Sequence, residues 1–145
     1  MGTFGVRNPR SVPAGKNALV QIWWHSPRRW TELDRIDCRL IAGGHPIGLV
    51  RFTQDDGVFW LVDGKSPASF GHPEERRILA VRAVSIDLAK SAIVRFGPSS
   101  HDVIVRIALA PSRSLRGHAL TLRVGARDDR GRSQPARVAG SLVVR

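Results

Sequence analysis

The segment 115–133 constrains the fold of this 145-residue chain most, because it has the pattern of one antiparallel strand and the turn that ends it. Apolar residues alternate with polar or small ones, which is the period of a strand with one buried face. The apolar positions are Leu120, Leu122, Val124 and Ala126. Aspartates and a glycine follow in residues 128–131 and predict a tight turn. A return strand over 136–144 is therefore expected to pair with the first.

Six residues of this hairpin have a spacing found in a known family. They are Gly117, Leu122, Val124, Ala126, Asp128 and Gly131. The hairpin resembles the last two strands of bacterial immunoglobulin-like and fibronectin type III-like domains, which often read G-x-x-Y-x-L-x-V-x-A-x-D-x-x-G. Leu120 stands where that family commonly has tyrosine, and the chain contains no tyrosine, so the corner hydrogen bond of such domains is absent or replaced. The resemblance implies an immunoglobulin-like β-sandwich, a fold that serves many functions.

Most of the remaining chain also has the pattern of short strands separated by turns. The expected strands cover residues 18–24, 38–42, 48–53, 58–62, 92–96 and 103–109, with a less regular stretch at 77–87. Residues 30–39 fit either a helical turn or a loop, and the glycines and prolines of residues 63–75 predict a loop. Without a long amphipathic helix, this pattern predicts an all-β, immunoglobulin-like antiparallel β-sandwich.

The N-terminal residues 1–17 are rich in glycine and proline, are basic, and lack both strand and helix periodicity. We therefore expect an extended basic arm, followed by a single sandwich domain over 18–145. Arg7 and Arg10 in this arm are candidate partner-binding residues. The segment lacks the apolar core of a signal peptide, and no apolar run reaches the roughly 20 residues of a membrane span. We expect neither a cleaved leader nor a membrane partner.

The charge of the chain is strong and uneven. Twenty-three basic residues against twelve acidic ones give a net charge of +11, and twenty of the basic residues are arginine. Residues 31–75 hold eight acidic and four basic side chains, so an acidic stretch lies inside a basic chain. A basic surface attracts polyanions or acidic protein surfaces. The preference for arginine also fits the codon bias of a GC-rich genome.

Several arginines alternate along the expected strands. Arg106, Arg123 and Arg127 are the candidates for partner contacts, and Arg82 and Arg95 follow the same pattern. If these side chains share a sheet face, that face is basic and solvated. The alternative is that they only protect edge strands from pairing with other chains.

Two adjacent tryptophans, Trp23 and Trp24, lie on an expected strand, so their side chains point to opposite faces and one of them is exposed. We expect Trp24 to form an aromatic and basic partner-binding patch with Arg28, Arg29 and Trp30, because tryptophan is enriched at interaction hot spots. Stacking of sugars or of single-stranded bases is a sharper alternative. Coverage of the exposed tryptophan by the N-terminal arm is a simpler one.

No motif indicates catalysis. The five histidines lack H-x-H or H-E-x-x-H spacing, and there is no G-x-S-x-G elbow or nucleotide-binding loop. Cys38 is the single cysteine, so no intramolecular disulfide forms, and its expected role is that of a small buried residue. We therefore expect no enzyme activity, no metal and no cofactor.

Three classes of function fit these observations. The first is a non-enzymatic structural subunit of a larger assembly, specifically a bacteriophage virion protein such as a capsid decoration or tail accessory subunit. It would be a homo-oligomer or lattice member that contacts acidic protein surfaces, and it would assemble in the host cytoplasm. The second is a cytoplasmic, basic nucleic-acid-associated domain with weak binding. The third is a carbohydrate-binding or adhesive module at a cell surface.

Overall fold

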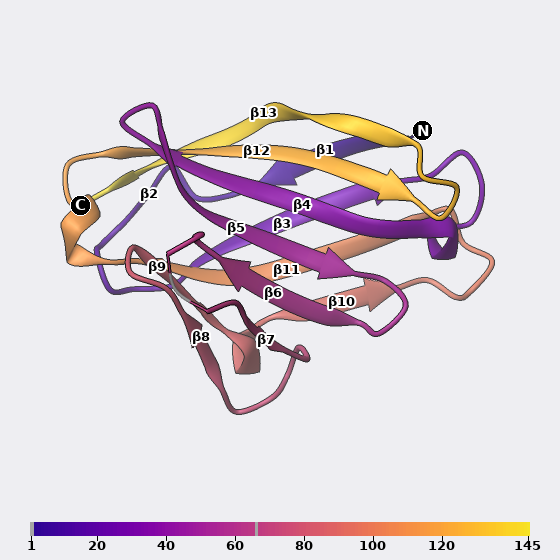
Figure 1. The fold of residues 1–145 in the computed structure, drawn as a ribbon, viewed down its shortest axis with the longest axis horizontal. Helices are drawn as coiled ribbons and strands as arrows, with labels where there is room; N and C mark the ends of the chain where they lie inside the picture. The colour runs from indigo at the N-terminus through magenta and orange to yellow at the C-terminus, as the bar shows by residue number, and fades with distance from the viewer. Residues whose placement is uncertain (1, 66) are drawn as a thin grey trace.

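The computed structural model describes residues 2–65 and 67–145 and forms two β-sheets packed face to face, which confirms the all-β sandwich (Figure 1). The six-stranded sheet has the order β1 (Thr3–Arg7), β3 (Ala18–His25), β11 (Asp102–Pro111), β9 (Val84–Asp87) and β8 (Ile78–Ala80), with β10 (Ala92–Arg95) also paired to β11. The seven-stranded sheet has the order β2 (Ser11–Val12), β13 (Ser133–Val144), β12 (Ala119–Asp128), β4 (Leu33–Ala42), β5 (His45–Thr53), β6 (Val58–Val62) and β7 (Ser69–Gly71).

Short 3-10 turns join some of the strands. They are η1 (Trp30–Glu32), η2 (Leu88–Lys90) and η3 (Arg113–Leu115). Strand pairing among the described residues is antiparallel except between β2 and β13, which run parallel. No helix in the described part of the chain is long and apolar enough to span a membrane.

The expected closing hairpin is present as β12 and β13. Leu120 pairs with Leu142, and the register shifts twice along the hairpin, once near Arg123 and once at Gly125. Leu120, Leu122 and Val124 are fully buried, so the alternating pattern of this strand marks the face that lies on the core. The β12 side chains between them point outward from the sandwich.

The core lies between the two sheets and is built from alternate residues of each strand. In β3 the buried side chains are Ala18, Val20, Ile22 and Trp24, which belong to the same core cluster as buried residues of β12 and β4. Phe4 of β1 stacks on Trp24 with ring centroids 5.5 Å apart. Burial of such large side chains is the main stabilising contribution in a domain of this size.

The N-terminal segment is extended, as expected, but its described part belongs to the sandwich. Strand β1 pairs along its whole length with β3, and β2 pairs with the last residues of β13. Val12 is buried in the core. A boundary at residue 17 therefore does not separate an arm from a domain. The glycines of this segment hid the alternation that places Phe4 and Val6 toward the core.

Two other segments differ from the expectation. Residues 30–39 begin with the turn η1 but then form most of the long central strand β4. The loop expected over residues 63–75 contains the edge strand β7, while residue 66 lies outside the described residues. A three-residue strand is too short to show a period, which is why its sequence gave no strand signal.

Candidate functional site: an arginine face on the seven-stranded sheet

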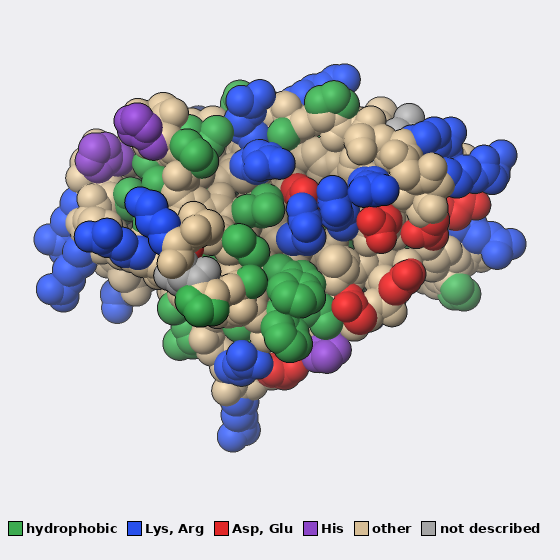
Figure 2. All heavy atoms as spheres, viewed as in Figure 1, with side chains coloured by type: hydrophobic (Ala, Val, Ile, Leu, Met, Phe, Trp, Pro, Cys, Tyr) green, Lys and Arg blue, Asp and Glu red, His purple; other side chains and the backbone are tan. Residues whose placement is uncertain are grey.

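The outer face of the seven-stranded sheet carries a cluster of arginine side chains from three neighbouring strands. We call these five residues the arginine face: Arg35 and Arg39 of β4, Arg51 of β5, and Arg123 and Arg127 of β12. Each lies at an outward position next to at least one buried residue of its strand, such as Ile36 beside Arg35. Figure 2 shows basic side chains gathered near the middle of this face.

Strand register brings like charges directly opposite each other. Arg123 lies opposite Arg39, and Arg127 lies opposite Arg35. Like charges at directly opposite positions of an antiparallel pair destabilise a sheet. The arginine pairs therefore do not stabilise the fold. Residues that disfavour the fold locally in this way are expected at functional sites. An anionic partner would remove the electrostatic cost.

Asp37 is the carboxylate at the centre of the arginine face. Arg51 donates from Nε to Oδ1 at 2.7 Å and from Nη2 to Oδ2 at 2.9 Å, and Arg35 Nε lies 3.7 Å from Oδ2. The hydrogen bond to Asp37 raises the pKa of Arg51 above its ordinary value, against the opposing effect of partial burial. Asp37 thus neutralises positive charge of Arg51 and Arg35, and not that of the other arginines of the face.

The other three arginines of the face keep their charge unbalanced. Within the described residues, no carboxylate lies within ion-pair distance of Arg39, Arg123 or Arg127. Arg123 donates from Nη2 to the carbonyl oxygen of Ala136 at 3.3 Å, which orients its guanidinium toward β13. These guanidinium groups are available for planar, bidentate contacts with carboxylates or phosphates.

A hollow of about 180 Å³ lies within this cluster, between β4 and the start of β13. Gly125 lies opposite Asp37 and between the two β12 arginines, and the backbone of β13 passes close to it. A Cβ at Gly125 would lie 2.8 Å from the carbonyl oxygen of Gln134, so the bulge requires glycine there. The lining of the hollow includes Arg35, Arg39 and Arg127. Since one water occupies roughly 30 Å³, the hollow has room for an oxyanion group.

An apolar patch borders the arginine face on one side. Trp60 lies opposite Arg51 in the neighbouring strand, and its ring centroid is 4.8 Å from that of Phe70. Phe70 is 49% exposed. In Figure 2 the hydrophobic side chains form a continuous area below the basic cluster. Aromatic and arginine side chains together are enriched in protein interfaces.

An acidic area borders the same face at the end of the sandwich that holds the β12–β13 turn (Figure 2). Burial raises the pKa of Asp129, and so does its proximity to other carboxylates. These neighbours are Asp55, Asp34, Asp128 and Glu32. The molecule therefore presents a basic face next to an acidic end.

The sequence candidates among the strand arginines do not share one surface. Arg123 and Arg127 belong to the arginine face, but Arg106 lies in β11, on the outer face of the other sheet. Its Nε donates to Oε1 of Gln21 at 3.0 Å. Arg35, Arg39 and Arg51 were not among the candidates expected from the sequence. Alternation of the charged residues at 35, 37 and 39 was the signal that could have indicated an outward strand face.

The expected patch of exposed tryptophans is wrong in two of its members. Trp24 is fully buried against Phe4, and Trp30 is buried with its Nε1 donating to the carbonyl oxygen of Gly97 at 3.0 Å. Trp23 is the exposed neighbour, at 44%. The signal that could have distinguished them is the period of the strand, because Trp24 shares its face with Val20 and Ile22, whereas Trp23 shares its face with polar residues.

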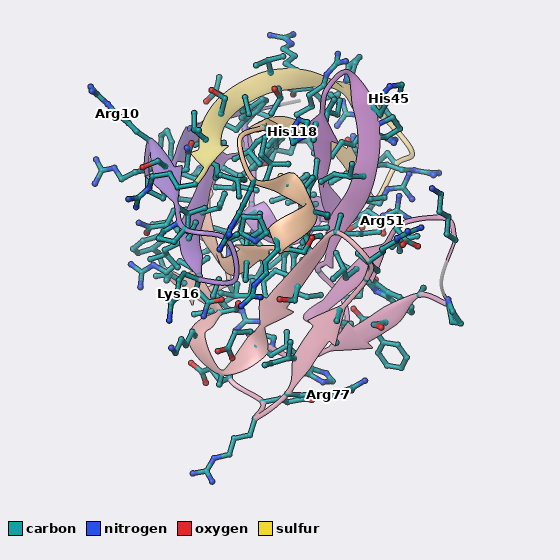
Figure 3. The ribbon with its side chains drawn as sticks, turned by 90° about the vertical axis from the view of Figure 1, so that its left-hand side faces the viewer. Arg10, Lys16, His45, Arg51, Arg77 and His118 are labelled. Carbon is teal, nitrogen blue, oxygen red and sulfur yellow. The ribbon has the colours of Figure 1, made fainter. Side chains whose placement is uncertain are left out.

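The remaining basic candidates lie elsewhere on the surface. Arg28 and Arg29 are exposed in the loop before η1, and Arg7 is exposed at the end of the edge strand β1. Figure 3 shows Arg10 extending from one side of the molecule, whereas Arg51 lies on the opposite side. Arg10 is therefore not an extension of the arginine face.

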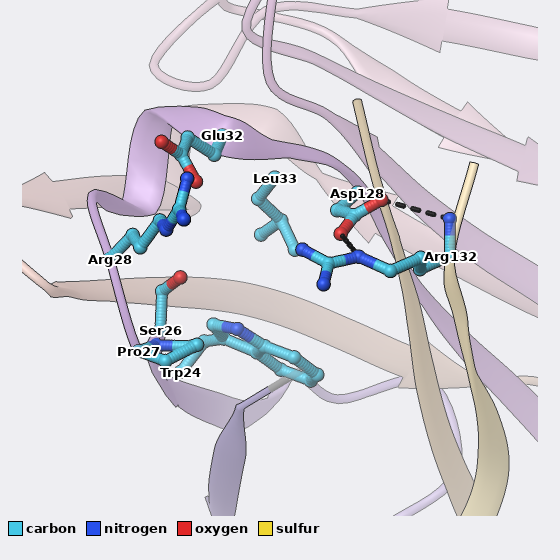
Figure 4. A pocket seen from close by; sticks show the side chains of 8 residues that line it. All are labelled: Trp24, Ser26, Pro27, Arg28, Glu32, Leu33, Asp128 and Arg132. Carbon is cyan, nitrogen blue, oxygen red and sulfur yellow. Dashed lines mark hydrogen bonds and ion pairs between the residues drawn. The ribbon is translucent and has the colours of Figure 1, made fainter. Parts of the chain in front are cut away.

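A second hollow, of about 200 Å³, lies at the acidic end of the sandwich and includes Arg28 in its lining (Figure 4). Its other arginine, Arg132, donates from Nε to Oδ2 of Asp128 at 2.7 Å. Burial opposes ionisation of Asp128, but hydrogen bonds from the backbone and side chain of Arg132 and from the Arg130 backbone together lower its pKa. These contacts stabilise the β12–β13 turn, so Asp128 and Arg132 in this hollow have a structural role.

The Cys38 thiol is buried and is not activated as a nucleophile. Burial, reinforced by the charge of Asp37, raises the pKa of the Cys38 thiol to about 12, so the thiolate nucleophile does not form at neutral pH. No three His, Cys, Asp or Glu side chains in residues 2–65 and 67–145 are placed to hold a metal ion together.

The fold and the site together define a class: a two-sheet β-sandwich with an arginine face on its seven-stranded sheet. No protein-family model, curated protein or solved structure matches this chain. Function must therefore be argued from the residues of the site.

Proposed function

We propose that this protein is a non-catalytic interaction subunit of a larger assembly, which binds an acidic protein surface through the arginine face. The observation that carries this proposal is the cross-strand pairing of like charges around the hollow at Gly125, with Arg39, Arg123 and Arg127 lacking a carboxylate partner. Carboxylates of a partner would pair with these guanidinium groups bidentately. The bound partner would thereby offset the repulsion within the sheet.

The surroundings of the face favour an acidic protein surface over nucleic acid. The acidic end beside the face repels a continuous phosphate backbone that extends beyond the arginines. The exposed ring of Phe70 provides apolar contact area next to the charged groups. A flat sheet face also offers no element that enters the major groove of duplex DNA.

Within this class, our specific proposal is a bacteriophage virion protein, either a capsid decoration or a tail accessory subunit. A basic face and an acidic end on one chain give repeated copies complementary surfaces, which suits a homo-oligomer or lattice. Membership of the immunoglobulin-like family, argued from the β12–β13 hairpin, is part of the same proposal.

A nucleic-acid-associated domain is the alternative, because the same arginines can contact phosphates. It predicts binding that depends on salt but not on sequence. The test below distinguishes the two.

The test compares two triple variants with the same loss of charge. R39S/R123S/R127S removes the unpaired arginines of the face, and R76S/R113S/R116S removes exposed arginines outside the strands. Complexes or virions are purified from the source, and the chain is quantified in them by mass spectrometry. We expect the wild type and the loop variant to be present in fixed stoichiometry with the same partner, and the face variant to be lost. Equal incorporation of all three proteins would refute the proposal.

A further inference from the structure

The outer face of the six-stranded sheet carries a second arrangement, which is independent of the arginine face. Its centre is Trp23 in β3, whose neighbours across the sheet are Gly5 in β1 and Ile104 in β11. The next outward positions along these three strands are polar. They are Gln21, Arg7 and Arg106 on one side, and His25, Thr3 and Asp102 on the other.

Space for a ligand exists beside the Trp23 ring. A hollow of about 320 Å³ is lined by Trp23, Gly5, Arg7, Gln21 and Ile104, with Val6 beneath them. A Cβ built on Gly5 would meet no atom within 4 Å, so the strand next to the exposed indole is bare. An indole ring with an open flank is a stacking surface for a flat, partly apolar molecule.

Hydrogen-bond donors lie on one side of Trp23, and Arg7 and Gln21 among them line the hollow. Gln21 lies between two arginines, and its Oε1 accepts from Nε of Arg106 at 3.0 Å. Neither Arg7 nor Arg106 lies within ion-pair distance of a described carboxylate. The amide of Gln21 and both guanidinium groups therefore have donors left for a ligand.

A carboxylate and an imidazole line the opposite side of Trp23. His25 Nδ1 and Asp102 Oδ1 are 2.6 Å apart, which fixes the imidazole over the sheet. The His25 ring lies 6.0 Å from the Trp23 ring and 5.6 Å from the His101 ring. Asp102 keeps about a third of its side chain exposed, so an acceptor is present near the indole.

We propose that this face binds an acidic saccharide. Its ring stacks on Trp23 above Gly5, its carboxylate pairs with Arg7, and its hydroxyl groups bond with Gln21 and with the His25–Asp102 pair. Hydroxyls both donate and accept, which matches a site with donors on one side and an acceptor on the other. A phosphate backbone only accepts, and Asp102 would repel it. The arginines without carboxylate partners select an acidic sugar over a neutral one.

The glycine at position 5 provides a test that leaves every proposed binding group in place. In Gly5→Val, the added side chain points outward into free space, and β-branched residues favour strands, so stability is expected to be kept. Its methyl groups occupy the space beside the indole where the sugar ring would lie. Trp23→Ala removes the stacking surface itself. Trp60→Ala, on the outer face of the other sheet, is the matched control.

The experiment titrates galacturonate and glucuronate trisaccharides into the full chain by calorimetry, with a neutral galactose trisaccharide and a short oligothymidylate as competing probes. We expect one of the acidic trisaccharides to bind and the neutral one to bind more weakly. Trp23→Ala and Gly5→Val should each weaken binding at least about tenfold, whereas Trp60→Ala leaves it unchanged. Arg7→Gln should reduce the preference for the acidic probe.

Three results would overturn the inference. They are the absence of binding by both acidic trisaccharides, unchanged affinity in Gly5→Val and Trp23→Ala, and tighter binding of the oligothymidylate than of either saccharide. Thermal unfolding of each variant checks that it is folded. Because the arginine face lies on the other sheet, none of these results affects the proposed assembly function.

Discussion

Asp37 is the carboxylate that offsets part of the positive charge of the arginine face. Its side chain is only 12% exposed and accepts two hydrogen bonds from Arg51. We expect Asp37→Asn to lower the free energy of unfolding by about 2 kcal/mol, because the charged hydrogen bonds are lost and the arginine repulsion is no longer balanced. Urea denaturation at low ionic strength measures the change, and added polyglutamate should restore part of it.

The matched control for this variant is Glu74→Gln, which removes a charge from an exposed loop position. Its effect should stay within about 0.5 kcal/mol, as for most surface substitutions. Equal effects of the two substitutions would show that Asp37 has no special electrostatic role.

We expect the substitution Asp129→Asn to increase the free energy of unfolding in a pH-dependent way. Burial and the neighbouring carboxylates raise its pKa in the folded state, so its protonated form is favoured there. The associated stabilisation is fully present below the unfolded pKa and is lost as pH rises through the folded pKa. At neutral pH the carboxylate therefore costs stability. Asp129→Asn should raise the free energy of unfolding by about 0.5 kcal/mol at pH 7 and low salt, a small value because the side chain is exposed and screened.

The gain from Asp129→Asn should vanish near pH 3, where the wild-type carboxyl is already protonated, and should shrink in high salt. Paired thermal unfolding curves at the two pH values measure it. A loss of stability at pH 7, or a gain of the same size at both pH values, would contradict the crowding of carboxylates at this end.

At the scale of elements, the N-terminal strands are structural parts of both sheets. Removing residues 2–12 deletes one of the two strands paired with β3, the ring stacked on Trp24 and the buried Val12. We expect the free energy of unfolding to fall by at least about 3 kcal/mol, comparable to the loss of a large core side chain. Denaturant unfolding of the truncated chain measures this. Unchanged stability with weaker assembly would instead support a separate arm.

The elements that could be predicted from sequence are those with a local signal. The β12–β13 hairpin was predictable because Leu120, Leu122 and Val124 alternate before the turn residues 128–131, which contain two aspartates and a glycine. Strand β7 and the N-terminal strands are short or interrupted by glycine, so their pairing depends on tertiary contacts that no local pattern encodes.

The site was less predictable than the fold, for a reason of register. Arg35 and Arg127 become neighbours only because β4 and β12 pair in one particular alignment, although they are distant in the sequence. The pairing also decides that Arg106 faces away from this cluster. Side chains from separate strands form a site only after the sheet order is known.

The whole molecule combines a net charge of +11 with a local excess of carboxylates at one end. Such a field attracts acidic surfaces from a distance, and the acidic end turns away those that approach in the wrong orientation. Net charge alone would attract any polyanion equally. Selective binding of an acidic protein surface therefore requires the arginines at their positions on the face, and the position of the charge can be tested separately from its amount.

Binding of polyglutamate to three proteins over a salt series tests this claim most directly. The proteins are the wild type, R39S/R123S/R127S and R76S/R113S/R116S, with duplex DNA as a second probe. Near physiological salt, about 0.15 M, the wild type and the loop variant should bind polyglutamate alike, the face variant should bind at least about tenfold more weakly, and DNA binding should be lost. Equal weakening in both variants, or DNA binding that persists at about 0.2 M salt and requires the arginine face, would contradict the account.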